Sequence, residues 1–199
     1  ALQNRLGLIY YKLGYEAGHK ETLRQALQCH QNALKVYSKR RTPARWAEVM
    51  SSFARTAQVF GEHVKSLEAM ATAANAYQAI LQVRDRDKVP LIWAATQNNL
   101  GSALFLLGKK AKNPDRIEAA VDAFEAALEV YVLRRKHRQA AVHRKHLARS
   151  RDLLEHMAPK SHLPRKFIEL DRSFNGNTSP NPKDVLDSGI DLSLIHISE

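Results

Sequence analysis

Apolar residues return along the chain at the spacing of an α-helix. The clearest run lies in residues 115–131, where the steps between apolar positions are only three or one: Ile117, Ala120, Val121, Phe124, Ala127, Leu128 and Tyr131. Since a helix turns once in about 3.6 residues, this spacing places all of these side chains on one face. We therefore predict a helix over 115–131 with Asn113 as its N-cap. A preceding helix is predicted over 93–107, with a turn at Gly108 between the two.

This helical hairpin recurs at an interval of 47 residues. Residues 1–47 and 95–141 share 16 identities in 47 aligned positions without a gap, where roughly 3 are expected by chance at average composition. One position of the first helix is always small, and the position before it is always large and apolar. These positions are Gly7, Ala54, Gly101 and Ala148, preceded by Leu6, Phe53, Leu100 and Leu147. The equal spacing predicts a tandem array of hairpins.

The array has about three and a half units within residues 1–157. The elements predicted for the first two units are a helix over 2–13, a turn over 14–20, a helix over 21–39, a helix from Pro43, a turn at Gly61 and a helix over 66–84. The fourth unit has only a first helix, over 139–157, which closes the array. Glycine inside a helix costs about 1 kcal/mol against alanine. At Gly101 we therefore expect a neighbouring helix to approach closely.

These positions resemble those of the tetratricopeptide repeat. The resemblance lies in the large and small pair of the first helix, the glycine at the predicted turn, and two alanines seven residues apart in the second helix, such as Ala120 and Ala127. The usual repeat has about 34 residues. The longer period here, together with the stretch 89–101, is similar to a long-period bacterial subtype. The resemblance implies an all-α fold, a solenoid of antiparallel helix pairs.

The resemblance also implies where a partner binds, because the first helices of such repeats line a concave groove. Matched residue by residue, the groove positions are Asn4, Tyr11, Ser51, Arg55, Gln58, Asn98, Ser102, Phe105, Lys145 and Arg149. Amide and hydroxyl groups there would bond a peptide backbone, and Arg or Lys would hold a carboxylate. The resulting hypothesis is a non-enzymatic scaffold that holds a peptide or helix of another protein. A merely solvated inner face is the alternative.

The net charge of +11 favours acidic partners, either acidic protein segments or nucleic acid. Eight positive residues, with no Asp or Glu among them, lie in residues 134–151: Arg134, Arg135, Lys136, Arg138, Arg144, Lys145, Arg149 and Arg151. This cluster supports a second hypothesis, nucleic-acid binding through phosphate contacts. No Phe, Tyr or Trp interrupts the cluster to stack bases. A third interpretation is the polar face that a terminal repeat needs for solubility.

Residues able to carry catalysis or bind a cofactor form no recognisable motif. Cys29 is the single cysteine, so an internal disulfide is excluded. His143 and His146 stand three apart on a predicted helix, near His137, but lack a third ligand, so we interpret them as part of a solvated basic face. His30 replaces an aromatic residue of the other units, and we interpret it as buried and hydrogen-bonded. We predict no enzymatic activity, no cofactor and no metal.

The remaining expectations concern location and the ends of the chain. No apolar run approaches the roughly 20 residues that span a bilayer, and no signal peptide is visible, so we predict a cytoplasmic protein without membrane contact. Residues 158–199 contain four of the seven prolines and no helical period, which is typical of a disordered tail. Residues 193–199 resemble translated cloning linker. We expect a fragment of a larger regulatory protein that lacks N-terminal repeats.

Overall fold

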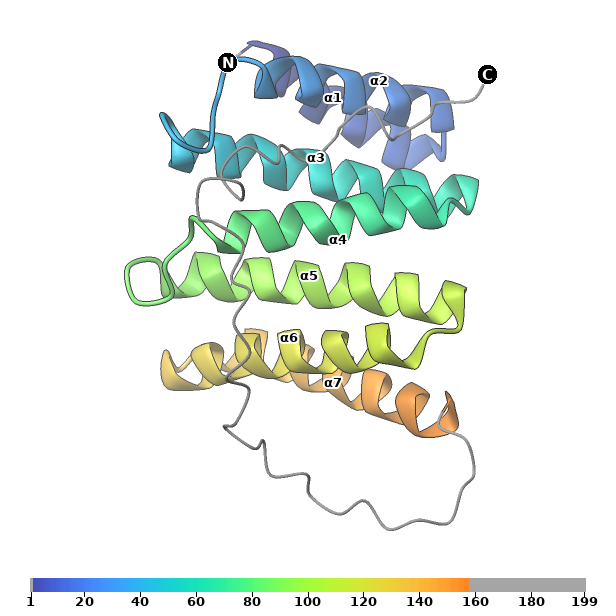
Figure 1. Ribbon diagram of the computed structural model, residues 1–199, viewed down its shortest axis with the longest axis vertical. Coiled ribbons are helices and arrows are strands. Elements are labelled where there is room, and N and C mark those ends of the chain that lie inside the picture. Colours follow the sequence, from blue (N-terminus) through green and yellow to red (C-terminus); the bar gives the residue numbers. More distant parts are fainter. Residues whose placement is uncertain (1, 158–199) are drawn as a thin grey trace, which may run out of the picture.

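The computed structural model describes residues 2–157, and all secondary structure in that range is helical (Figure 1). The helices are α1 (Leu2–Ala17), α2 (Lys20–Leu34), α3 (Pro43–Val64), α4 (Leu67–Leu81), α5 (Pro90–Ala111), α6 (Pro114–Leu133) and α7 (His137–Met157). The predicted all-α class is confirmed. The expectations for 158–199 fall outside the described residues.

The helices pack in the order of the chain. Each helix lies mainly against the one before it and the one after it, and the first helices also touch one another, α1 against α3 and α3 against α5. Figure 1 shows the resulting row, with α1 and α2 at one end and α7 at the other. The period is visible in the elements, because α3 and α5 both have 22 residues and begin at prolines 47 positions apart.

Three glycines one period apart lie inside first helices and not at turns, which corrects the turns predicted at these positions. Gly14, Gly61 and Gly108 are all buried in helical segments. A Cβ atom added to Gly108 would lie 2.7 Å from Cδ1 of Ile117, and one added to Gly61 would lie 3.0 Å from Cγ of Met70. The absence of a side chain therefore lets the second helix of each hairpin approach the first.

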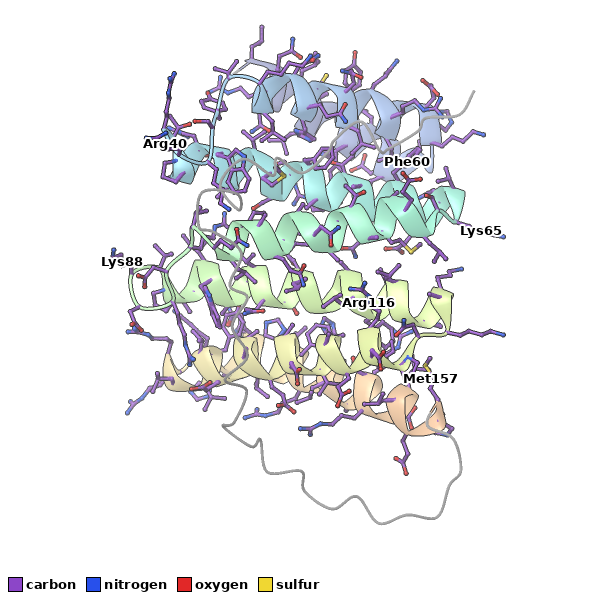
Figure 2. The ribbon with its side chains drawn as sticks, viewed as in Figure 1. Arg40, Phe60, Lys65, Lys88, Arg116 and Met157 are labelled. Carbon is purple, nitrogen blue, oxygen red and sulfur yellow. The ribbon has the colours of Figure 1, made fainter. Side chains whose placement is uncertain are left out.

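The chain turns four residues after each of these glycines. Lys65 and Lys112 adopt left-handed backbone angles, with φ of 57° and 51°. The amide of Lys112 donates to the carbonyl oxygen of Gly108, which ends α5 as a left-handed C-cap. Asn113 then accepts a hydrogen bond from the amide of Arg116, so the predicted N-cap is confirmed. Lys65 and Met157 lie along one side of the row, and Arg40 and Lys88, in the connections between hairpins, lie along the opposite side (Figure 2).

The small position of the first helix faces a large ring of the second helix. A Cβ atom on Gly101 would lie 2.9 Å from Cδ1 of Phe124, and one on Gly7 would lie 2.6 Å from the imidazole of His30. The expected close approach at Gly101 is therefore confirmed. In α7 the equivalent residue, Ala148, is exposed, because no second helix covers it within the described residues.

The buried core runs without interruption from α2 to α7. Its largest fully buried side chains include Phe53, Tyr77 and Leu104, which come from successive helices. The second helices are shorter than predicted and end at Leu34 and Leu81, not near residues 39 and 84. None of the described helices combines the length and apolar composition that crossing a bilayer requires.

A valine at position 101 would press against Phe124 in the core. We expect Gly101→Val to lower the free energy of unfolding by about 1–3 kcal/mol, because the packed Phe124 ring has no free space into which it could move away from the valine. The exposed equivalent provides the control, and Ala148→Val should change the same quantity by less than about 0.5 kcal/mol. Urea denaturation measures both values. Equal losses in the two variants would contradict the close approach.

Candidate partner-binding surface

A cleft of about 170 Å³ opens between α5, α6 and α7. It is lined by Ser102, Phe105, Leu106, Phe124, His146, Arg149 and Ser150. Three of these, Ser102, Phe105 and Arg149, were predicted as groove positions from the sequence. The other four were missed. His146 could have been found, because it stands one helical turn before Arg149 and so shares its face.

Arg149 lies flat over an aromatic ring at the mouth of this cleft. Its guanidinium carbon is 5.1 Å from the centre of the Phe105 ring. Arg149 is exposed, and within residues 2–157 it forms no ion pair with an acidic side chain. The ring holds the guanidinium in place through a cation–π contact, which leaves its N–H donors available to a carboxylate.

The same arrangement occurs two repeats earlier. The guanidinium of Arg55 in α3 lies 4.7 Å from the centre of the Tyr11 ring in α1. Tyr11 is half-buried and stacks on Tyr15, with 5.8 Å between ring centres. Burial raises the pKa of Tyr11, so its hydroxyl stays neutral at physiological pH. The arginine and its ring are 44 residues apart in both pairs, so the repeat itself places them.

Two histidines of α7 face the core, which corrects their predicted place on a solvated basic face. His143 is buried and stacks on Tyr131, with 4.5 Å between ring centres. His146 is half-buried, and its Nδ1 lies 3.3 Å from Oδ1 of Asn98. Burial is the main cause that lowers the pKa of both imidazoles. They are therefore neutral at pH 7 and add no positive charge to the surface.

Several predicted polar positions are already engaged within the fold. Asn4 is buried, and its Oδ1 lies 3.0 Å from Nδ1 of His30, so this carboxamide is engaged inside the first hairpin. Ser51 and Ser102 donate their hydroxyl groups to backbone carbonyl oxygens one turn earlier in their own helices. Gln58 is half-buried, whereas Lys145 is exposed. The predicted groups most open to a partner are therefore the exposed cations Arg55, Lys145 and Arg149.

Cations also cover the two tryptophans, which sequence reasoning missed. Lys39 lies 5.9 Å from the ring centre of Trp46, and Arg86 lies 5.3 Å from that of Trp93. Both cations come seven residues before their tryptophan, in the connections between hairpins. Arg86 also pairs with Glu129 at 2.7 Å. Because a cation from the same repeat position covers both tryptophans, these contacts belong to the repeat and not to a separate site.

The basic cluster of residues 134–151 is exposed at all eight positively charged positions. Arg151 pairs with Glu125 of α6, so this part of the cluster is neutralised. Within the described residues, no three His, Cys, Asp or Glu side chains are close enough to hold a metal ion. Comparisons of the chain with protein-family models, with curated proteins and with solved structures found no match.

The burial of His30 makes the stability of the folded chain pH-dependent. Burial, with a smaller contribution from Arg55, lowers the pKa of His30 to about 4 from 6.5. In the unfolded chain His30 therefore binds a proton near pH 6.5, whereas in the folded chain it binds one only near pH 4. We expect this residue to remove about 2 kcal/mol of stability between pH 7.5 and pH 5.

Urea denaturation at the two pH values measures this loss in the parent chain and in His30→Phe. Phenylalanine occupies the equivalent position of the third hairpin, Phe124, so the variant should keep the packing against Gly7. Its free energy of unfolding should fall by about 2 kcal/mol less over the same pH interval. An identical pH dependence in both proteins would contradict the assignment to His30.

Proposed function

We propose that the chain is a tetratricopeptide-like α-solenoid whose first helices hold an acidic peptide segment of another protein. The observation that carries the proposal is the guanidinium of Arg149, fixed over Phe105 at an open cleft and free of an acidic partner among residues 2–157. An arginine immobilised by a ring binds a carboxylate at a lower entropic cost than a freely rotating one. In this proposal the protein has no catalytic step, takes no cofactor and acts in the cytoplasm as part of a larger regulator.

The two cation–aromatic pairs suggest how such a segment would lie. Arg55 and Arg149 stand on α3 and α7, two first helices apart in the row. Neighbouring packed helices have axes about 10 Å apart, so the two guanidinium groups are separated by roughly 20 Å. An extended chain advances about 3.3 Å per residue, and it would therefore span that distance with about six residues. The proposed ligand is an extended segment with two acidic side chains at this spacing.

Selection from displayed random peptides of about twelve residues tests the proposal, because such peptides are long enough to reach both arginines. We expect selected peptides to carry two Asp or Glu residues about six positions apart. Arg149→Glu should weaken their binding at least about tenfold, or about 1.4 kcal/mol, because the reversed charge repels the carboxylate. Fluorescence anisotropy with the selected peptides measures the change.

Arg144→Glu is the matched control, because Arg144 is an exposed arginine of the same helix that does not line the cleft. The two variants carry the same net charge, and only Arg149→Glu should lose peptide affinity. Selected peptides without acidic residues, or equal losses in both variants, would contradict the cleft as the binding site. Binding of mixed-sequence RNA at physiological salt, weakened equally by both reversals, would instead favour the nucleic-acid hypothesis.

A further inference from the structure

The cleft between α5, α6 and α7 has an apolar interior. Phe105 and Phe124 in its lining are 8% and 2% exposed, and Leu106 is half-buried. Ser102 and Ser150 also line the cleft, but each donates its hydroxyl proton to a backbone carbonyl oxygen one turn earlier in its own helix. An apolar group that enters the cleft therefore leaves neither hydroxyl proton without an acceptor.

The cleft has room for one aromatic ring. Its volume is about 170 Å³, and an apolar cavity of about 150 Å³ in a protein core holds a benzene molecule. Two rings of its lining, Phe124 and His146, meet edge to face with 5.4 Å between their centres. Aromatic rings gain from such contacts beyond the burial of their area, so the cleft favours a ring over an aliphatic side chain.

The earlier hairpins show that stacking does not require this apolar interior. The residues at the positions of Phe105, Leu106 and Phe124 are Tyr11, Lys12 and His30 in the first hairpin, and Gln58, Val59 and Tyr77 in the second. In each of those hairpins at least two of the three side chains carry a polar or charged group, and in the third hairpin none does. The apolar interior is therefore a feature of this cleft and not of the repeat.

The charge of the cleft lies at its mouth. Arg149 is exposed, and it is the only residue of the lining with a permanent charge. Its guanidinium carbon lies 5.1 Å from the ring centre of Phe105. A carboxylate of the ligand therefore finds its partner on Arg149, whereas a ring of the ligand fits inside the cleft.

The two positions are close enough for one short peptide segment to reach both. Packed rings have centres about 4.5–7 Å apart, so a ligand ring beside Phe105 would lie on the order of 5–10 Å from the guanidinium of Arg149. In an extended chain, side chains two residues apart point to the same side and are separated by about 7 Å. We propose that the partner's segment places an aromatic side chain in this cleft, two residues away from the acidic side chain that Arg149 holds. This assignment rests on the proposed function, because it takes the acidic ligand of Arg149 as given.

A capped pentapeptide, aspartate–glycine–4-fluorophenylalanine–glycine–aspartate, is the probe, because it has an acidic residue two positions from the ring in both chain directions. Fluorine NMR at physiological salt detects its binding through broadening of the fluorine signal, and we expect a dissociation constant of about 1 mM. An unlabelled peptide with phenylalanine should displace the probe. The same peptide with alanine should bind at least about tenfold more weakly, because it buries no ring. A probe with serine in place of both aspartates should lose affinity by a similar factor, because it offers Arg149 no carboxylate.

Ser102→Leu fills the cleft and leaves Arg149 in place. The equivalent residue of α3 is the exposed Arg55, so this repeat position accepts a large side chain. Thr72→Leu is the matched control, because Thr72 is also half-buried and also donates its hydroxyl proton one turn back in its helix, but does not line the cleft. Ser102→Leu should weaken binding of the probe at least about tenfold, whereas Thr72→Leu should bind it like the parent chain. Circular dichroism checks that both variants keep their helices.

Equal displacement by the phenylalanine and alanine peptides, equal binding to the Ser102→Leu and Thr72→Leu variants, or no broadening by the parent chain would overturn the ring position. The acidic ligand is judged separately, by the charge reversals on α7. If Arg149→Glu and Arg144→Glu bind the probe equally well while Ser102→Leu binds it weakly, the acidic half of the motif is wrong, and the proposed function is contradicted with it.

Discussion

The fold depends on the close approach of the two helices within each hairpin. The first helix α5 has no side chain at Gly101 and Gly108, and the second helix α6 fills these two spaces with Phe124 and Ile117, respectively. These contacts are made by shape alone and need no polar partner, so they are dry and dense, like the interior of an organic crystal. Glycines one period apart, Gly14, Gly61 and Gly108, give three successive hairpins a close contact of this kind.

Once the hairpins have formed and stacked, each side of a first helix such as α3 has a different neighbour. One side packs on its own second helix and another on the preceding hairpin, as for Phe53 and Thr56 of α3. The remaining side meets the neighbouring first helices, and on this side Phe105 lines a cleft. At two of the junctions between first helices, an arginine of the next first helix covers a ring and still reaches solvent: Arg55 over Tyr11 and Arg149 over Phe105. The surface that supports the proposed binding role is thus a consequence of the stacking.

The sequence predicted what depends on spacing and on the local preferences of single residues. The all-α class follows from spacing, the start of α3 from Pro43, and the close contact at Gly101 from the cost of a glycine inside a helix. It misplaced the turns because a glycine such as Gly108 suits a turn and a tight helix contact equally well. It placed Asn4 in the groove because a helical pattern gives the direction of a side chain but not its partner, here the distant His30. The α5–α7 cleft could not be predicted, because it depends on how three helices meet.

The helices at the two ends of the described row depart from the repeat at positions that are buried in the middle. A residue that a neighbouring hairpin covers must be small or apolar, since an unpaired charge buried there costs several kcal/mol. At α7 this constraint is lifted, and Arg151 occupies the position held by the buried Leu104 in α5. In α1 the larger Ile9, which is exposed in the described structure, stands at the position of the buried Ala103. Positive charge gathers at the α7 end, whereas large apolar side chains are exposed at both ends, such as Ile9 on α1 and Leu133 on α6. The helices at the ends are thus where the described chain differs most from its own repeat.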